Sequence, residues 1–310
     1  MRNSLDWRIV FSLGVAFLLL SLILVVRPVK QHGIRESLFW FLKIFPGKKC
    51  DIVIAGDSRV LQGVDPASMR ERLGGSVEIV NAGFRSAAFD NAYLDFAHGL
   101  LQNSSKKVLL LGITANAFTL QSAADNGYIE QKKLSASRPY ALPEWCVILE
   151  RKLQPLSLRE SLSLISLRNR ADTYETFHED GWLEADLIPR NTQAAFPLYR
   201  RRFDGNQVDG ATVAALIVKV REWVASGVTT VAFEPPVPDE MRAIEDEHSA
   251  FARVQFIEDF RNMGGIWLEL DRLRYVTVDG SHLAPESAQL LSQDLAIAIK
   301  SSIDGEADAK

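Results

Sequence analysis

The sequence predicts an α/β fold in which a parallel sheet carries helices on its faces. Short apolar runs that end in glycine or a turn alternate with longer segments of helical periodicity, a pattern typical of such sheets. The chain has 310 residues, 47% of them hydrophobic, which is enough for a sizeable core in one large domain. Polar motifs follow several of the runs, at the sheet edge where α/β proteins bind their ligands.

Five apolar runs are expected to form the strands. The first ends at Gly56, and a helix should begin at Pro66 with Asp65 as its N-cap, because both residue types are favoured at these positions. The expected strands lie within residues 51–56, 77–83, 106–112, 228–238 and 265–270. Helices are expected over 92–102, 211–226 and 239–262, and a loop followed by an amphipathic helix over 276–300.

A charge-free apolar run covers residues 9–26 and is long enough to cross a bilayer as a helix. We expect a transmembrane anchor there, after a short N-terminal tail at 1–8. A cleaved signal peptide is the alternative, but the run is long for one and no small-x-small cleavage site follows it. Positive residues flank the run on both sides, so charge alone does not orient it.

The remaining domain boundaries follow from composition. Residues 27–49 form a juxtamembrane segment in which Phe39, Trp40 and Phe41 could lie at the membrane interface or pack against the following domain. The α/β domain is expected over 50–303, with an insertion at about 121–205 where the alternation of strands and helices breaks down. Residues 304–310 are polar and are expected to form a disordered tail.

Charge and cysteine content exclude some classes of function. A net charge of −4 and a single short basic run, Arg200–Arg202, give no reason to expect nucleic-acid binding. Cys50 and Cys146 do not have zinc-ligand spacing, so no metal site is expected from them, and no cofactor is expected. They could form one disulfide or remain two thiols.

Four polar segments should meet at the carboxyl ends of the strands, although they are distant in sequence. They read GDSR after the first expected strand, NAGF after the second, GITAN after the third, and DGSH near the C-terminus. Each motif alone is weak: Ser58, for example, could simply cap a helix. Their order, with the first three each directly after a strand, favours a shared catalytic site.

These segments supply the groups that acyl-ester chemistry requires. Ser58 would be the nucleophile, His282 the general base and acid, and Asp279 the carboxylate that orients the imidazole. The backbone N–H groups of Ser58 and Gly83, with the side-chain amide of Asn116, could stabilise the oxyanion.

In the order of these motifs the chain resembles the SGNH (GDSL-like) hydrolase superfamily, over roughly residues 50–118 and 210–300. The resemblance implies a flavodoxin-like, doubly wound parallel sheet. It departs from the family pattern after the third strand, where the family usually has Gly-x-Asn-Asp. Here Thr114 takes the usual asparagine position, and Asn116 comes two residues later. Asn116 is favoured as the oxyanion donor because an amide donates better, and Thr114 is the alternative.

The chain is similar in particular to the membrane-anchored branch that acts on acyl groups of cell-surface polysaccharides. This similarity implies a serine acyltransferase that O-acetylates an extracytoplasmic polysaccharide and receives acyl groups from a polytopic membrane partner. It also implies a single-pass protein of the inner membrane with a periplasmic catalytic domain. Two alternatives remain: a carbohydrate esterase with the same triad, and a non-catalytic carbohydrate-binding or assembly component.

One further histidine lies in the expected insertion. His178 stands beside two acidic residues and near Trp182, so it could bind a metal or a sugar. A solvated acidic loop with one packed tryptophan is the interpretation we favour, because charged clusters are common in loops.

Overall fold

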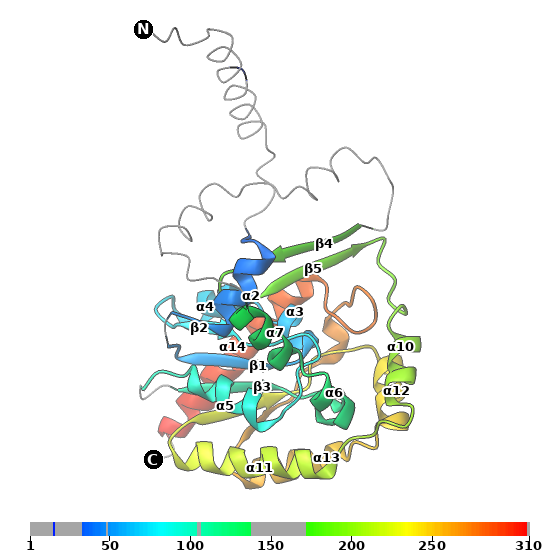
Figure 1. The fold of residues 1–310 in the computed structure, drawn as a ribbon. Helices are drawn as coiled ribbons and strands as arrows, with labels where there is room; N and C mark the ends of the chain where they lie inside the picture. Colours follow the sequence, from blue (N-terminus) through cyan, green and yellow to red (C-terminus); the bar gives the residue numbers. More distant parts are fainter. Residues whose placement is uncertain (1–14, 16–32, 48, 104–106, 138–171, 309–310) are drawn as a thin grey trace, which may run out of the picture. The chain divides into compact units, whose positions relative to one another are not determined.

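The core of the protein is a five-stranded parallel sheet with the order β2-β1-β3-β6-β7 (Figure 1). The computed structural model describes residues 15, 33–47, 49–103, 107–137 and 172–308. The order is that of flavodoxin-like sheets, so the prediction of a doubly wound α/β fold is confirmed. The strands are β1 (Ile52–Gly56), β2 (Ile79–Asn81), β3 (Val108–Gly112), β6 (Thr229–Phe233) and β7 (Ile266–Leu268).

Two of the interior strands, β1 and β3, are apolar throughout because helices cover both faces of the sheet. Every residue of β1 and β3 is buried. The register pairs Gly56 with Gly112, and Gly112 with Phe233, so that β1, β3 and β6 end at the same level. The segments that follow these strands therefore start from one edge of the sheet.

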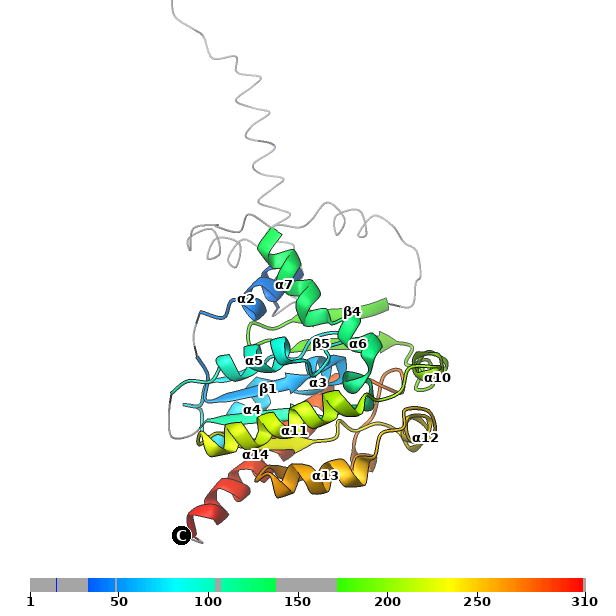
Figure 2. The ribbon, with the colours of Figure 1, turned by 60° about the horizontal axis from the view of Figure 1, so that its bottom comes forward.

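Alternate residues of the strands face two helical layers. Ile52 and Ile54 pack with α4 (Pro66–Leu73) and α14 (Pro285–Asp308). Val53 and Ala55 pack on the other side with α5 (Asn91–Gly99), α11 (Gly210–Ala225) and α13 (Arg253–Asn262). Figure 2 shows α11 and α13 lying side by side on this second layer. The predicted N-cap of α4 is confirmed, since Asp65 accepts a hydrogen bond from the Ala67 N–H.

Two aromatic residues of the segment at 27–49, Phe39 and Trp40, pack against the α/β unit. They lie on α2 (Glu36–Ile44) and are 1% and 6% exposed. The Trp40 ring stacks on Phe84 at 6.0 Å, and the Phe39 ring lies 5.1 Å from Phe177. Of the two alternatives for these side chains, the structure therefore shows packing against the domain, and α2 belongs to the unit that begins at Gly33.

The prediction of one continuous helix over 239–262 is wrong, because two helices occupy this stretch. α12 covers Asp239–His248, and α13 begins at Arg253 after a break. Ala250 has a φ of 57°, which a continuous helix does not allow, and the Ser249 carbonyl accepts a hydrogen bond from the Val208 N–H. The sequence shows no break because apolar periodicity continues through it without proline or glycine.

The expected disordered tail at 304–310 is corrected as far as Asp308, where α14 ends. Glu306 and Ala307 are good helix formers and extend a helix that is already anchored in the core. Residues 309–310 lie outside the described part of the chain.

The described parts of the expected insertion at 121–205 are ordered elements. They are α6 (Leu120–Ala124), α7 (Gly127–Ser137), α10 (Phe196–Phe203) and an antiparallel hairpin of β4 (Asp172–Phe177) and β5 (Leu183–Ile188). Cys50 is buried, and Cys146 lies outside the described residues. None of the described helices is long and apolar enough to cross a membrane. The expected span at 9–26 lies outside the described residues, apart from Val15.

The burial of α2 predicts that it contributes to the stability of the whole unit. Trp40→Ala should lower the free energy of unfolding of the full chain by about 3–5 kcal/mol, because it removes a large buried aromatic side chain. Phe45→Ala is the control, since Phe45 is 48% exposed and should cost less than about 1 kcal/mol. Urea unfolding measures both values. If both variants lost the same small amount of unfolding free energy, α2 would not be part of the folded core.

Candidate active site

The turn after β1 is fixed by a buried carboxylate. Asp57 is 2% exposed and is the N-cap of α3 (Ser58–Gly63). Its Oδ1 accepts a hydrogen bond from the Arg59 N–H at 2.9 Å, and its Oδ2 accepts one from the Thr114 hydroxyl at 2.7 Å. Ser58 is therefore held as the first residue of α3, and its side chain is only partly buried.

The structure brings the three predicted triad residues together. The Ser58 Oγ lies 2.9 Å from the His282 Nε2, and the His282 Nδ1 lies 2.8 Å from the Asp279 Oδ2. The Asp279 Oδ1 accepts hydrogen bonds from the backbone N–H groups of Ser281 and His282, both at 2.8 Å. Both carboxylate oxygens are thus used, which fixes the carboxylate against the imidazole.

These contacts also set the ionisation of Asp279. Burial acts to raise the pKa of its carboxyl, but the hydrogen bond from His282 and the two backbone hydrogen bonds outweigh burial and lower the pKa to about 2. At neutral pH the carboxylate is charged and accepts the Nδ1–H of the imidazole. The Nε2 of His282 is then free to take a proton from Ser58, as serine catalysis requires.

Part of the insertion supports the loop that carries Asp279. The Asp279 carbonyl accepts a hydrogen bond from the Ala195 N–H at 2.9 Å, and the Val278 carbonyl accepts one from the Asn191 N–H at 3.0 Å. Gly280 has a φ of 90°, and a Cβ there would lie 2.3 Å from the Thr192 carbonyl oxygen. The loop therefore packs directly on residues 191–196, a support that the sequence did not reveal.

The predicted oxyanion donors differ in whether their N–H groups already have a hydrogen-bond partner. The Ser58 N–H is at the start of α3, where a helix leaves such groups without an internal partner. The Gly83 N–H donates instead to the Asn81 Oδ1 at 2.9 Å. Asn81 also donates from its side chain to the carbonyls of Val60 and Val64, so it is held in this position. In this conformation Asn81 already occupies the Gly83 N–H, and the oxyanion role of Gly83 stays a prediction.

The choice between Thr114 and Asn116 favours Asn116. The Thr114 hydroxyl donates its proton to Asp57, so it has none left for an oxyanion. Asn116 lies in the short helix η1 (Ala115–Phe118) and is 1% exposed. Its side-chain oxygen has no hydrogen-bond partner among the described residues. The side-chain NH2 of Asn116 also makes no hydrogen bond within the described part of the chain, so this group is available as a donor.

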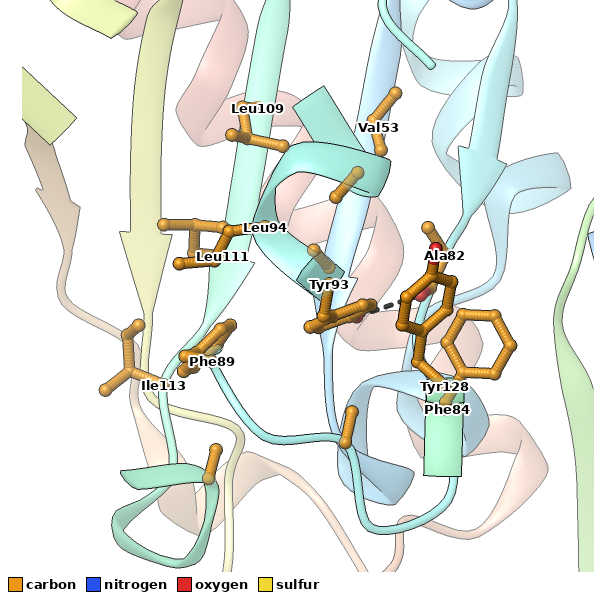
Figure 3. Close-up of a cluster of buried hydrophobic side chains, with 14 of the residues drawn as sticks. Val53, Ala82, Phe84, Phe89, Tyr93, Leu94, Leu109, Leu111, Ile113 and Tyr128 are labelled. Carbon is orange, nitrogen blue, oxygen red and sulfur yellow. Dashed lines mark hydrogen bonds between the residues drawn. The ribbon is translucent and has the colours of Figure 1, made fainter. Parts of the chain in front are cut away.

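A buried tyrosine joins the end of β1 to the loop after β2. The Tyr93 hydroxyl accepts a hydrogen bond from the Gly56 N–H and lies 2.9 Å from the carbonyl oxygens of both Gly56 and Ala82 (Figure 3). Burial raises the pKa of Tyr93, so it remains a proton donor. The sequence did not single out Tyr93, because a tyrosine on the apolar face of a helix usually belongs to the core.

Trp182 does not offer an open stacking face for a sugar. It is 2% exposed, and its indole N–H donates to the Gln62 carbonyl at 2.9 Å. His178 stacks on it at 4.6 Å, and its Nε2 lies 2.9 Å from the Glu184 Oε2. The favoured interpretation of a packed tryptophan agrees with these contacts. Within the described ranges, no group of three or more acidic, histidine or cysteine side chains could hold a metal ion.

Comparisons with known proteins find only distant similarity. No protein-family model matches the chain, and no curated protein matches it. A solved Streptococcus pneumoniae structure, provisionally described as platelet activating factor, is 13% identical with a TM-score of 0.38, covering 92% of this chain and 99% of the other. A Parabacteroides merdae structure, provisionally described as a GDSL-like lipase, is 14% identical with a TM-score of 0.36, covering 81% and 97%. The chemistry must therefore be derived from this chain's own residues.

The depressed pKa of Asp279 predicts a pH-dependent contribution to stability. An aspartate whose folded-state pKa is below its unfolded value, about 3.9, stabilises the fold above that value and loses the contribution as pH falls to about 2. The difference in unfolding free energy between the wild type and Asp279→Asn should therefore be constant above about pH 5 and shrink between about pH 4 and 2.

Chemical unfolding at a series of pH values checks this expectation. Asp204→Asn, which changes an exposed aspartate, is the control and should show no such trend. A difference for Asp279→Asn that is independent of pH down to pH 2 would contradict the assigned ionisation.

Proposed function

We propose that the protein is an SGNH-type serine enzyme that transfers acyl groups through a covalent acyl-Ser58 intermediate. The observation that carries the proposal is the hydrogen-bonded chain from the Ser58 Oγ through both nitrogens of His282 to Asp279. A helix cap would explain Ser58 alone. It would not explain why the His282 Nε2 lies 2.9 Å from the Ser58 Oγ while an ionised carboxylate binds the other nitrogen at 2.8 Å.

The first half of the reaction forms the acyl-enzyme. The Ser58 Oγ attacks the carbonyl carbon of an acyl ester while its proton passes to the His282 Nε2. Asp279 stabilises the imidazolium that results. The Ser58 N–H and the Asn116 amide are the proposed donors to the oxyanion of the tetrahedral intermediate. When the intermediate collapses, the alcohol leaving group takes the proton from the His282 Nε2, and the acyl group remains on Ser58.

The second half transfers the acyl group to an acceptor. His282 takes the proton of an acceptor hydroxyl, whose oxygen attacks the acyl-serine, and then returns that proton to the Ser58 Oγ as the new ester leaves. We propose that the acceptor is a carbohydrate hydroxyl of an extracytoplasmic polysaccharide, that the acyl group is acetyl, and that a polytopic membrane protein supplies it. The motif resemblance and the apolar run at 9–26 support this choice. With water as the acceptor, the same residues would act as an esterase.

The covalent intermediate gives a direct test. The full chain exposed to an activated acetyl ester should gain the mass of one acetyl group and turn the ester over. Ser58→Ala should lose the adduct and lower turnover by about 10⁴-fold or more. Ser301→Ala, a matched change at an exposed serine on α14, should behave as the wild type.

An oligosaccharide acceptor added to the same reaction separates transfer from hydrolysis. Acetylated oligosaccharide formed at the expense of free acetate would support the transferase, whereas free acetate alone would support the esterase. An adduct that persists in a folded Ser58→Ala variant would remove Ser58 from the mechanism.

We also propose that residues 9–26 anchor the protein in the inner membrane with the catalytic unit in the periplasm. The length of the charge-free run supports this proposal. The full chain should sediment with membranes and resist high salt, whereas a chain lacking residues 9–26 should not. Protease added outside the inner membrane should degrade the catalytic unit. Release of the full chain by salt, or protection from that protease, would contradict the anchor or the orientation respectively.

A further inference from the structure

A buried cation immediately follows Ser58 in the chain. Arg59 is 3% exposed, and its guanidinium lies 2.7 Å from the Glu245 Oε1 of α12, which is also buried. Removing two charges from water costs several kcal/mol per ion in a protein, and mutual attraction repays this only when the geometry is excellent. A pair of this kind next to a catalytic serine therefore requires an explanation.

A contribution to stability does not by itself explain the buried pair of Arg59 and Glu245. The Arg59 Nη2 and the Glu245 Oε1 are within ion-pair distance, yet neither has a hydrogen-bond partner of good geometry among the described residues. Burial opposes the charge on both groups. For Arg59, Glu245, Tyr199 and Asp57 outweigh burial and raise its pKa, so the guanidinium stays charged. For Glu245, burial outweighs Arg59 and raises the pKa of the carboxyl. A well-packed apolar pair would be as stable or more stable at such a position.

The guanidinium also contacts the loop that carries His282. The Arg59 Nε donates to the Ser281 Oγ at 3.1 Å, and Ser281 is the residue directly before His282. The Ser281 hydroxyl in turn donates to the Tyr199 hydroxyl of α10 at 2.8 Å, and the guanidinium carbon of Arg59 lies 4.8 Å from the centre of the Tyr199 ring. One side chain thus connects the residue after the nucleophile to the residue before the base.

We propose that Arg59 is a positioning residue that sets the separation of the Ser58 Oγ and the His282 Nε2, and that Glu245 holds Arg59 in place for this task. Arg59 shares α3 with Ser58, and its rigid guanidinium can bind Ser281 and Glu245 at the same time. The inference rests on the proposed function of the triad. Arg59 acts through Ser281, because no described contact joins it to the reacting atoms.

A set of variants separates positioning from simple stability. Arg59→Met/Glu245→Met removes both charges, so the full chain should unfold at the wild-type temperature or above. Its kcat should nevertheless fall about 100-fold at an unchanged KM, because the base is no longer held in place. Arg59→Lys keeps the positive charge but should still lower kcat, because an ammonium lacks the planar guanidinium that binds Ser281 and Glu245 at the same time. Arg261→Met, which changes an exposed arginine paired with Glu269, is the matched control and should keep the wild-type rate.

A double-mutant cycle tests the route through Ser281. Ser281→Ala and Arg59→Met/Glu245→Met should each lower kcat, and together they should cost little more than the methionine pair alone, because both break the contact between Arg59 and Ser281. Effects that add in full would overturn the proposed route. If the methionine pair does not fold, Ser281→Ala alone tests the route, because it leaves the Arg59–Glu245 pair in place, and an unchanged kcat would then overturn the route.

A measurement that needs no activity keeps this inference separate from the proposed function. In the full chain with ¹⁵N-labelled histidine, the Nδ1–H of His282 that binds Asp279 should give a protected proton signal, assigned by its loss in His282→Gln. The signal should broaden or vanish in Arg59→Met/Glu245→Met and persist in Arg261→Met. A wild type that shows the signal but no ester turnover would refute the proposed function alone. A folded double variant with an unchanged signal, and with unchanged kcat where turnover exists, would refute the positioning role.

Discussion

The hydrogen bond between the Asp57 carboxylate and the Thr114 hydroxyl is the contact on which the candidate site depends. It joins the segments that follow β1 and β3, which end level because Gly56 pairs with Gly112. The other carboxylate oxygen caps α3, so one buried group fixes both the direction of the helix and its distance from the neighbouring strand. The first helical residue, Ser58, is placed as a consequence, and His282 can reach it from the C-terminal loop.

This contact gives a physical reason for the altered third motif. An asparagine amide at position 114 would be divided between binding Asp57 and binding an oxyanion, whereas the hydroxyl of Thr114 gives its only proton to Asp57. The role of oxyanion donor then passes to a group outside the usual position. Asn116 fits this requirement, because it is buried and its side-chain NH2 makes no hydrogen bond within the described part of the chain. The departure from the motif pattern is therefore compatible with the proposed site.

The parts of the structure that could be predicted are those with a local signal. The strands were predictable because burial on both faces makes β1 and β3 continuously apolar, and Ser58, Asp279 and His282 because chemically distinctive residues stood in an expected order. The rest depends on partners distant in sequence. The Arg59–Glu245 pair joins residues 186 positions apart in the numbering, and the capture of the Gly83 N–H by Asn81 depends on side-chain geometry. No periodicity or motif marks such contacts.

A second buried basic side chain, Lys43, holds α2 against the edge of the sheet. Lys43 of α2 donates to the carbonyls of Asn81 and Gly181 at 2.7 and 2.6 Å, and burial lowers its pKa although Asp180 opposes this. Gly181 has a φ of 90°, and a Cβ there would lie 2.1 Å from the Asn81 carbonyl oxygen, so the hairpin approaches this loop at backbone distance. Lys43 and Arg59 thus have parallel roles: each is a buried basic side chain whose N–H groups contact oxygen atoms of separate segments. A site assembled from loops after different strands requires such groups. The register of the sheet fixes where each loop begins, but only side-chain contacts fix the positions of the residues further along the loop.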